Sequence, residues 1–458
     1  MASVVYTKLG EHRGNRRLWL EGNILSRHGI KPGDRFRLDW DTDNKRLVLR
    51  LADDGERTIS KRKRGEKVSP VLDINASELA ELFGQVDRVR VVVRPEGLLV
   101  TLHPHQAACQ ERLERVRDRL RRGEALRVGS LAHGAGVLDH ALHSGLRRAG
   151  IASRLAFGVE IEAKYLEASL ENNPVWDKDS TAICAPMQDV EVSRLAPVEI
   201  LVAGLPCTGA SLSGRAKNKL AFAEQHETAG SLFVAFLAFI EATQPAVVVL
   251  ENVPPYQNTV SMHVIREVLE SRGYALEERV LSGPEFGSLE RRDRLCVVAA
   301  TEGLEIDLQT LRAVRAREHS LAEILEPVAE DSPRWRDLSY LRDKAVKDEA
   351  AGKGFKRQVL KGDEDGCGTI GRGYAKYRST EPMLSHPSDP VLERLFTPAE
   401  HAAVKTIPGK LIEGVAETTA HEMLGQSVIH CVFEAVGAHL GEALNRLCAP
   451  VEPHRAAA

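Results

Sequence analysis

Residues 200–207 read ILVAGLPC, an apolar run that predicts a buried β-strand ending at the thiol of Cys207. A second apolar run, residues 246–250, leads directly into Glu251. Ligands bind at the strand ends of an open α/β sheet, so a soft nucleophile and a carboxylic acid are expected at one edge. This pairing suits covalent attack on an electron-poor ring. The alternative is a buried, inert cysteine, which is the more common role of that residue.

Strand-like and helix-like segments alternate over residues 126–302, as in a parallel sheet covered by helices on both faces. Residues 303–390 lose this rhythm and carry mixed charges, prolines and several glycines, which predicts a loop-rich second lobe. Order returns in residues 391–447, which end in a helix and are predicted to complete the core, and residues 448–458 form a tail. The predicted fold class is therefore α/β.

The first part of the chain, residues 1–105, predicts a small mixed, mostly β domain with a weak internal repeat. Residues 24–37 are echoed by residues 78–90, and each copy continues into an alternating strand. This unit is similar to the swapped-hairpin fold of AbrB-type DNA-binding antitoxins, in which two copies close one barrel. The resemblance implies DNA binding, with a scaffold or dimerisation module as the alternative. Charged residues 60–67 predict an exposed connection between the copies, and residues 106–125 predict a linker helix.

The composition is that of an ordinary globular protein, with 458 residues of which 43% are hydrophobic and 28% charged. No apolar stretch approaches the roughly 18 residues of a membrane span, and the N-terminus lacks the apolar core of a signal peptide. Seven scattered cysteines without a CxxC pair argue against a metal site or a disulfide framework, and for a reducing cytoplasm. The net charge is −3, yet residues 1–105 carry five more basic than acidic side chains. Such an excess marks either a polyanion-binding face or simply a solvated surface.

A glycine-rich turn after the first strand of the predicted sheet points to a nucleotide. Residues 127–131 lead into Gly134 and Gly136, which let the backbone approach a nucleotide closely. The next strand ends in Glu160, which is predicted to bind the two hydroxyls of a ribose, with an exposed strand-end charge as the alternative. Asp189, at the end of the following strand, is predicted to accept a hydrogen bond from an adenine amino group.

Short motifs follow one another in a set order along residues 126–447. They are Gly134 to Gly136, Glu160, Asp189, Pro206 with Cys207, Glu251 to Val253, Glu290 to Arg294, Arg394 to Glu400 and Gly425 to Val428. This succession resembles the DNA (cytosine-5)-methyltransferase family. The resemblance implies a Rossmann-like, S-adenosylmethionine-dependent methyltransferase core, with residues 303–390 as the target-recognition domain.

The residue types fit the chemistry of that family. Carbon-5 of cytosine becomes nucleophilic only after addition to carbon-6, and the soft thiolate of Cys207 is the group expected to add. Glu251 would act at ring atom N3, while Arg294 and Arg292 would hold the carbonyl oxygen. The methyl group comes from S-adenosylmethionine, and the cytosine must flip out of duplex DNA to be reached.

The resemblance also assigns binding residues. Those for the cofactor are Gly134, Gly136, Glu160, Asp189, Gln426 and Ser427; those for double-stranded DNA are Ser211, Arg215, Lys217 and Lys219 in a closing loop, and Thr369 near the end of the recognition domain. Positions that depart from the family pattern are Val137, Leu205, Thr208, Ala210, Glu290 and Gln426. Glu290, for example, stands where the family usually has a glutamine. The departures affect DNA contacts and the way the methionine moiety is held, rather than the acid, the nucleophile or the cofactor carboxylates.

Two other functions remain open. The tRNA cytosine methyltransferases share the same core, and a catalytically inactive DNA-binding regulator could be built on it. The recognition lobe and the N-terminal repeat favour DNA over tRNA, and the retention of Cys207, Glu251 and Arg294 together argues against an inactive protein. The resemblance implies a prokaryotic, nucleoid-associated protein of the cytoplasm, and whether it has a cognate restriction endonuclease as a partner stays open from the sequence. It would act as a monomer, or as a dimer through its N-terminal domain.

Overall fold

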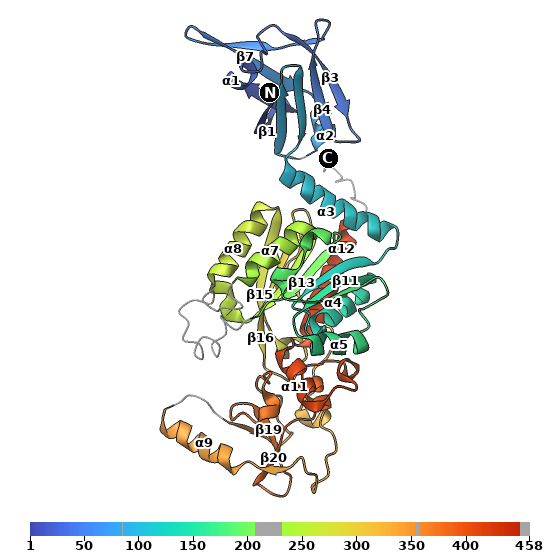
Figure 1. Ribbon diagram of the computed structural model, residues 1–458, viewed down its shortest axis with the longest axis vertical. Coiled ribbons are helices and arrows are strands. Elements are labelled where there is room, and N and C mark those ends of the chain that lie inside the picture. Colours follow the sequence, from blue (N-terminus) through green and yellow to red (C-terminus); the bar gives the residue numbers. More distant parts are fainter. Residues whose placement is uncertain (85, 207–230, 353–356, 449–458) are drawn as a thin grey trace, which may run out of the picture. The chain divides into compact units, whose positions relative to one another are not determined.

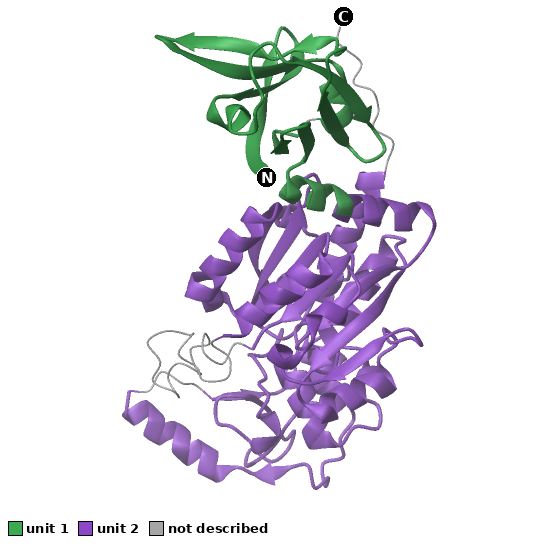
Figure 2. Cartoon of the chain, turned by 45° about the horizontal axis from the view of Figure 1, so that its top comes forward, with its two compact units in different colours: residues 1–111 green, residues 112–458 purple. Residues whose placement is uncertain are grey.

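The computed structural model of the chain describes residues 1–84, 86–206, 231–352 and 357–448. The chain divides into two compact units, residues 1–111 and residues 112–458 (Figure 2). Helix α3, Pro104–Arg121, contains the division between them. Among the described residues, no helix is both long enough and apolar enough to cross a lipid bilayer.

The first unit is built on one nine-stranded sheet and two short helices. The strands are β1 Ser3–His12, β2 Asn15–Glu21, β3 Arg35–Asp41, β4 Arg46–Leu51, β5 Arg57–Thr58, β6 Ser60–Arg64, β7 Lys67–Asn75, β8 Arg88–Arg94 and β9 Gly97–Leu102, and the helices are α1 Asn23–Ser26 and α2 Glu78–Phe83. Alternate side chains point to opposite faces of a strand, so Leu18 and Leu20 of β2 are both buried on the inner face. They share a core with Phe36, Ile74 and Phe83, which come from β3, β7 and α2.

The two halves of the first unit repeat one arrangement, a β-hairpin followed by a short helix and a second hairpin. In the sheet, β2 pairs with β7 and β4 pairs with β9, while β1 pairs with β8 and β5 pairs with β3. Because each of the first three pairings joins one half to the other, neither half completes the sheet alone. The two echoed segments of the sequence occupy equivalent positions, since each begins at a short helix and runs into a strand.

The charged segment 60–67, expected to be an exposed connection, is instead part of a β-hairpin arm. Strand β6 pairs with the start of β7, from Ser60 opposite Val71 to Arg64 opposite Lys67, and every residue of β6 is exposed. The ladder uses backbone groups, so charged side chains on both faces do not prevent it. Basic side chains therefore project from both faces of the arm, which carries the label β7 in Figure 1.

The second unit contains a seven-stranded sheet in the order β12-β11-β10-β13-β14-β16-β15. Its strands are β10 Leu126–Leu131, β11 Ser153–Glu160, β12 Thr181–Cys184, β13 Ile200–Gly204, β14 Val247–Asn252, β15 Tyr274–Ser282 and β16 Asp293–Thr301. The first five strands of this order, from β12 through β11, β10 and β13 to β14, run parallel. Strand β16 is antiparallel to both β14 and β15. The carboxyl ends of β10, β11, β13 and β14 therefore lie at one edge of the sheet, where ligands bind in such folds.

Helices cover both faces of this sheet (Figure 1). Helices α4 Val137–Arg148 and α12 His430–Cys448 pack on one face, and α7 Leu232–Thr243 and α8 Val260–Ser271 on the other; α5 Ala163–Asn172 follows β11. Val202 and Val249 join the first of these cores, while Leu201 and Val248 join the second. Burial on both faces explains why the strands read as continuous apolar runs. The predicted α/β, Rossmann-like fold is confirmed.

A smaller sheet, in the order β17-β20-β19-β18, forms the second lobe, residues 303–394. Its strands are β17 Arg336–Asp337, β18 Gln358–Leu360, β19 Pro382–Ser385 and β20 Leu392–Arg394, with α9 Ser339–Ala350 between β17 and β18. The lobe has a core of its own, which includes Leu341, Ile370 and Met383. Helices α10 Pro398–Val404 and α11 Glu417–Gln426 then lead back to α12.

Candidate active site

Strand β13 ends at Gly204, beside Glu251 of β14. A Cβ on Gly204 would lie 3.5 Å from Oε2 of Glu251, an ordinary van der Waals distance, so the carboxyl group lies close to the end of β13. The chain continues through Leu205 and Pro206 to Cys207, the predicted nucleophile. Cys207 lies outside the described residues, as do the predicted DNA contacts Ser211, Arg215, Lys217 and Lys219 and the atypical positions Thr208 and Ala210.

Asn252, next to Glu251, holds the segment that leads to Cys207. It is 1% exposed, and its Nδ2 donates a hydrogen bond of 3.1 Å to the carbonyl oxygen of Leu205. Its Oδ1 accepts a hydrogen bond of 2.9 Å from the backbone N–H of Val253. No role for Asn252 was apparent from the sequence. The signal that could have found it was an amide directly after an acid at the end of a buried strand. A buried amide needs hydrogen-bond partners, which predicts that Asn252 holds a neighbouring segment.

Glu251 is paired with Arg294, which comes from the antiparallel strand β16. Nε of Arg294 lies 2.9 Å from Oε1 of Glu251, and the side chains are mostly buried, at 16% and 13% exposed respectively. Burial raises the pKa of the Glu251 carboxyl above its ordinary value, although Arg294 and Arg292 oppose this shift. A raised pKa favours the protonated form, which an acid acting at a ring nitrogen requires.

A second cysteine, Cys296 of β16, lies opposite Glu251 in the strand pair. It is fully buried, and burial together with the Glu251 carboxyl raises the pKa of its thiol to about 12. The thiolate is the reactive form of cysteine. Cys296 is therefore unsuited to nucleophilic attack and is no competitor to Cys207.

Arg292, predicted to hold the base together with Arg294, points toward the second lobe. It is 5% exposed, and its Nη1 donates a hydrogen bond of 3.3 Å to the carbonyl oxygen of Ile370. The same nitrogen lies 3.6 Å from Oε1 of Glu290. The structure thus brings Glu251 and Arg294 together, whereas the contacts given above for Arg292 are with Ile370 and Glu290.

Glu160 ends β11 and lies beside the glycine turn that follows β10. Its Oε2 accepts a hydrogen bond of 2.6 Å from the backbone N–H of Gly134, and its Oε1 accepts one of 2.9 Å from that of Glu162. Because Glu160 is only 7% exposed, it is not the exposed strand-end charge of the alternative interpretation. Each carboxylate oxygen keeps acceptor capacity for a further donor.

The two glycines of this turn have left-handed backbone conformations. The φ angle is +59° at Gly134 and +71° at Gly136, a region that favours glycine. A Cβ on Gly136 would lie 2.4 Å from Nδ2 of Asn173, whereas a Cβ on Gly134 would meet no atom within 4 Å. The turn is therefore open over Gly134, beside the fixed carboxylate of Glu160. This combination fits a nucleoside whose ribose hydroxyls donate to that carboxylate.

Asp189 was predicted to end a strand, and this prediction was wrong. Strand β12 ends at Cys184, and Asp189 lies exposed in the short 3-10 helix Met187–Asp189 that follows Pro186. The neighbouring strand β11 ends at Glu160, opposite Cys184, so the ladder between the two strands stops there.

The other predicted contacts lie at the junction between core and second lobe. Gln426 is the exposed last residue of α11, and Oγ of Ser427 donates to the carbonyl oxygen of Met423 at 2.6 Å. Thr369 is exposed, and its Oγ1 donates to the carbonyl oxygen of Arg291 at 2.9 Å. The residues predicted to bind cofactor and DNA thus come from both lobes of the second unit.

Comparison with known proteins places this site in a family. A sequence model described as C-5 cytosine-specific DNA methylase matches residues 126–442. The chain belongs to the C-5 cytosine-specific DNA methylase family. The predicted family is confirmed, and with it the enzyme class, a DNA (cytosine-5-)-methyltransferase. Members of the C-5 cytosine methylase family generally use S-adenosylmethionine.

Two type II methyltransferases and one solved structure resemble different shares of the chain. The type II methyltransferase M.NlaX of Neisseria lactamica is 26% identical over 298 residues, which cover 64% of this chain and 90% of that protein. The type II methyltransferase M.SsoII of Shigella sonnei is 26% identical over 255 residues, which cover 52% of this chain and 62% of that protein. The crystal structure of the S. pombe Dnmt2 methyltransferase has a TM-score of 0.54 at 20% identity, covering 70% of this chain and 99% of its own. This structural likeness shows a shared fold.

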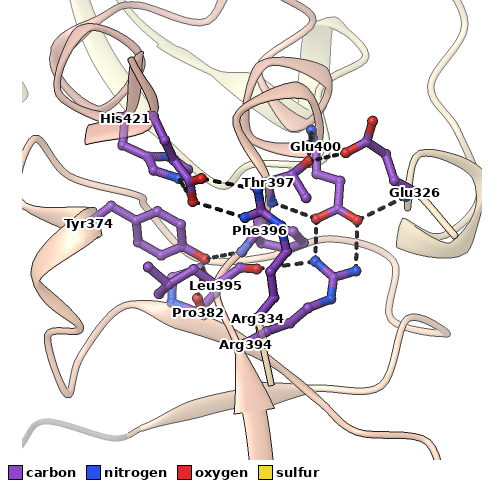
Figure 3. A network of polar contacts seen from close by, with 11 residues as sticks. Glu326, Arg334, Tyr374, Pro382, Arg394, Leu395, Phe396, Thr397, Glu400 and His421 are labelled. Carbon is purple, nitrogen blue, oxygen red and sulfur yellow. Dashed lines mark hydrogen bonds and ion pairs between the residues drawn. The ribbon is translucent and has the colours of Figure 1, made fainter. Parts of the chain in front are cut away.

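In this cytosine methylase, residues 394–400 join the second lobe to the core (Figure 3). Arg394 and Glu400 form a buried two-pronged ion pair, with Nη1 to Oε2 at 2.6 Å and Nη2 to Oε1 at 2.8 Å. Thr397 caps α10, because its Oγ1 accepts from the N–H of Glu400 at 3.1 Å. The backbone N–H of Glu326, in the second lobe, donates to the Glu400 carboxylate at 2.9 Å. In the sequence, residues 394–400 were one of several motifs in a set order. In the fold, their contacts attach the second lobe to the core.

Proposed function

We propose that this chain transfers a methyl group from S-adenosylmethionine to carbon-5 of a cytosine in double-stranded DNA. The observation that carries the proposal is the Glu251–Arg294 pair, which lies beside the strand that leads to Cys207. A buried acid next to a fixed guanidinium suits a ring that must gain electron density during the reaction. The names of the bacterial relatives, type II methyltransferases, support DNA modification as the activity.

The reaction would begin at Cys207, whose thiolate adds to carbon-6 of the cytosine and forms an S–C bond. The electrons of the conjugated ring move onto N3, which takes a proton from Glu251, while Arg294 holds the carbonyl oxygen. Carbon-5 is now electron-rich and forms a bond to the electrophilic methyl group that the cofactor supplies. Loss of the carbon-5 proton to water and cleavage of the S–C bond then restore the aromatic ring and the thiolate, while N3 returns its proton to the Glu251 carboxylate.

A cytosine stacked in a duplex cannot reach these groups, so the target base would flip out of the helix. We propose that Glu160 and the turn at Gly134 bind the ribose of the cofactor, because the carboxylate is fixed beside an open surface. Asp189 would accept from the adenine amino group, and Gln426 with Ser427 would lie at the methionine end.

Covalent trapping tests the proposal. In a duplex that contains 5-fluorocytosine, loss of the carbon-5 substituent is blocked, so the S–C bond persists. Wild type with S-adenosylmethionine should form a complex that survives denaturing electrophoresis on a pool of such duplexes with randomised sequence. Cys207→Ala should form none, and Cys296→Ala, the matched control at the buried thiol, should still form it. A wild type that forms no complex, or a Cys207→Ala protein that does, would overturn the proposal.

The same assay separates the two alternative functions. A complex with tRNA that contains 5-fluorocytosine, but none with the duplex, would assign the chain to tRNA cytosine methylation. Binding of duplex DNA without trapping on either substrate would identify a catalytically inactive DNA-binding protein. Mapping of 5-methylcytosine in a host that expresses the chain would then define the recognised site. The cognate restriction endonuclease that we propose as partner should fail to cut host DNA at that site.

The first unit adds a second proposed contact with DNA, through the hairpin arm of β6 and β7. Residues 60–67 carry five basic side chains against one acidic side chain. Arg62 and Arg64 lie on one face of the arm and pair with Glu21, whereas Lys61 and Lys63 lie on the opposite face. An exposed basic ribbon of this kind attracts the phosphate backbone without reading bases.

Salt-dependent binding tests the arm. Lys61→Ala/Lys63→Ala keeps the Glu21 ion pairs and should reduce the slope of log affinity against log salt by about 2 on a duplex without a methylation site. The matched control is Arg27→Ala/Lys31→Ala, which removes the same charge from exposed positions elsewhere on the unit. Equal losses in both variants would contradict a specific role for the arm.

A further inference from the structure

Glu290 is a buried carboxylate that the reaction described above does not use. Neither Glu290 nor Lys405 exposes any surface, and Nζ of Lys405 lies 2.5 Å from Oε2 of Glu290. Lys405 directly follows α10, and the backbone N–H of Glu290 donates to the carbonyl oxygen of Val404 at 3.1 Å. The ion pair therefore lies where the start of β16 meets the end of α10.

The second oxygen of Glu290 holds a loop of the second lobe, residues 368–371. Oε1 accepts a hydrogen bond of 3.1 Å from the backbone N–H of Ile370, and the carbonyl oxygen of the same residue accepts from Arg292 at 3.3 Å. The backbone N–H and the carbonyl group of Ile370 are thus both bound by side chains from the segment just before β16. The neighbouring residue Thr369 is exposed and donates to the carbonyl oxygen of Arg291.

The loop is held at both ends as well as at its centre. The backbone N–H of Gly368 donates to Oε1 of Gln358 at 2.8 Å, and that of Gly371 donates to Oε1 of Glu381 at 3.2 Å. A Cβ on Gly425 of α11 would lie 2.2 Å from the carbonyl oxygen of Gly371, so the loop is pressed against that helix. Its backbone position is therefore set by groups outside the loop.

Glu290 and Arg292 come just before β16, in the same segment of chain as Arg294, the second residue of that strand. The first two bind Ile370, and the third binds Glu251 at 2.9 Å. Residues 290–294 thus contact the second lobe at one end and the catalytic acid at the other. The loop and the residue that pairs with Glu251 are therefore connected through five consecutive residues of the chain.

We infer that Glu290, with Lys405 as its counter-ion, positions loop 368–371 on the strand that carries Arg294 and so helps determine which DNA sequences are methylated. This inference rests on the proposed DNA methyltransferase function. A glutamine could accept from Ile370 without any cation, whereas a buried glutamate needs one. Buried ion pairs contribute little net stability, and their best-established role is to fix one arrangement among several. Glu290 is therefore a positioning residue, not a catalytic one.

The test uses a pool of DNA duplexes with randomised bases around one cytosine, followed by sequencing of 5-methylcytosine. This readout does not require the recognised site to be known beforehand. Glu290→Gln/Lys405→Met keeps an acceptor for Ile370 without the ion pair between residues 290 and 405 and should give the wild-type motif. Glu290→Met/Lys405→Met removes the acceptor and should raise the share of methylation outside the motif about 10-fold, as expected for loss of a hydrogen bond worth about 1.4 kcal/mol.

Glu278→Gln is the matched control. Glu278 lies on the neighbouring strand β15, and the substitution removes its carboxylate from a partly buried ion pair with Arg266. Its motif should equal that of wild type. If Glu290→Met/Lys405→Met does not fold, Glu381→Leu tests the same loop through Gly371 and should relax the motif in the same direction. An unchanged motif with uniformly lower activity in the folded variant would overturn the inference. Absence of any methylation by wild type would instead contradict the proposed function.

Discussion

Nε of Arg294 lies 2.9 Å from Oε1 of Glu251, across two neighbouring antiparallel strands. The sequence places these residues in separate motifs, and the sheet joins them. The guanidinium fixes the carboxyl group where the chain turns toward Cys207, while burial makes its ionised form unfavourable. A neighbouring cation and burial thus act in opposite directions on the same acid.

Replacement of Glu251 by glutamine should abolish most of the activity. Glu251→Gln keeps the size of the side chain but cannot release a proton, so kcat should fall by about 10²–10⁴-fold, the usual contribution of a positioned acid. Single-turnover methylation of the randomised duplex pool measures this effect. Affinity for S-adenosylmethionine, measured by calorimetry, should stay at the wild-type value. Wild-type kcat in this variant would show that Glu251 is not the acid.

The pH dependence of kcat should carry the signature of Glu251. Burial raises the pKa of this carboxyl, so the protonated, active form persists above the ordinary range of a glutamate and is lost as the pH rises through the folded-state pKa. We therefore expect an alkaline limb in the wild-type profile of single-turnover rate. Glu251→Gln should lack that limb. An identical alkaline limb in both proteins would assign it to another group.

Removal of the Glu160 carboxylate should weaken cofactor binding. Glu160→Ala loses the acceptor that is fixed by Gly134 and Glu162, and the affinity for S-adenosylmethionine should fall by about 10- to 100-fold, as expected for one or two hydrogen bonds to a charged group. Calorimetric titration measures the change. Glu162→Ala is the control, because Glu162 contributes its backbone N–H, which alanine retains. Equal affinities in wild type and Glu160→Ala would place the ribose elsewhere.

The junction between lobe and core should lose stability in mild acid. His421 is fully buried, its Nδ1 lies 3.0 Å from Nδ1 of His401, and burial lowers its pKa to about 4. The unfolded chain takes up a proton near pH 6.5 while the folded chain does not, so this stability is present above pH 6.5 and is lost as the pH falls toward 4. The loss should amount to about 3 kcal/mol.

Urea unfolding at pH 7, 5.5 and 4.5 measures this dependence. Other buried histidines also titrate, so the comparison with His421→Phe isolates the contribution of one group. The variant should show a smaller loss of unfolding free energy between pH 7 and 4.5 than wild type. Parallel curves for the two proteins would mean that His421 already takes up its proton in the folded state near pH 6.5.

Much of the core could be predicted from the sequence because strand ends follow from local pattern. The apolar run before Cys207 and the run before Glu251 are indeed neighbouring strands, β13 and β14. The sequence likewise placed a glycine turn after β10 and an acid at the end of β11, and the structure joins them through the hydrogen bond between Gly134 and Glu160. These predictions succeeded because a parallel sheet brings consecutive carboxyl ends together. The AbrB-like resemblance of the first unit stays a prediction.

Other features depended on pairings that no local pattern contains. The direction of Arg292 toward Ile370 and the ion pair between Glu290 and Lys405 arise from packing between distant segments. The basic segment 60–67 became a hairpin arm because β7 offers it a backbone ladder, which its charges alone do not reveal.

The sequence by itself determined where strands β10, β11, β13 and β14 end and which side chains follow them, because apolar runs, glycines and acids occur in a local order that dictates where strands stop. Only the tertiary structure decided how the acid Glu251 is held, since its partner Arg294 arrives from an antiparallel strand. Only the tertiary structure, too, showed that Glu290 is buried against Lys405 and Ile370. Burial and pairing set the charge state of a side chain, and both depend on neighbours that lie far away along the chain.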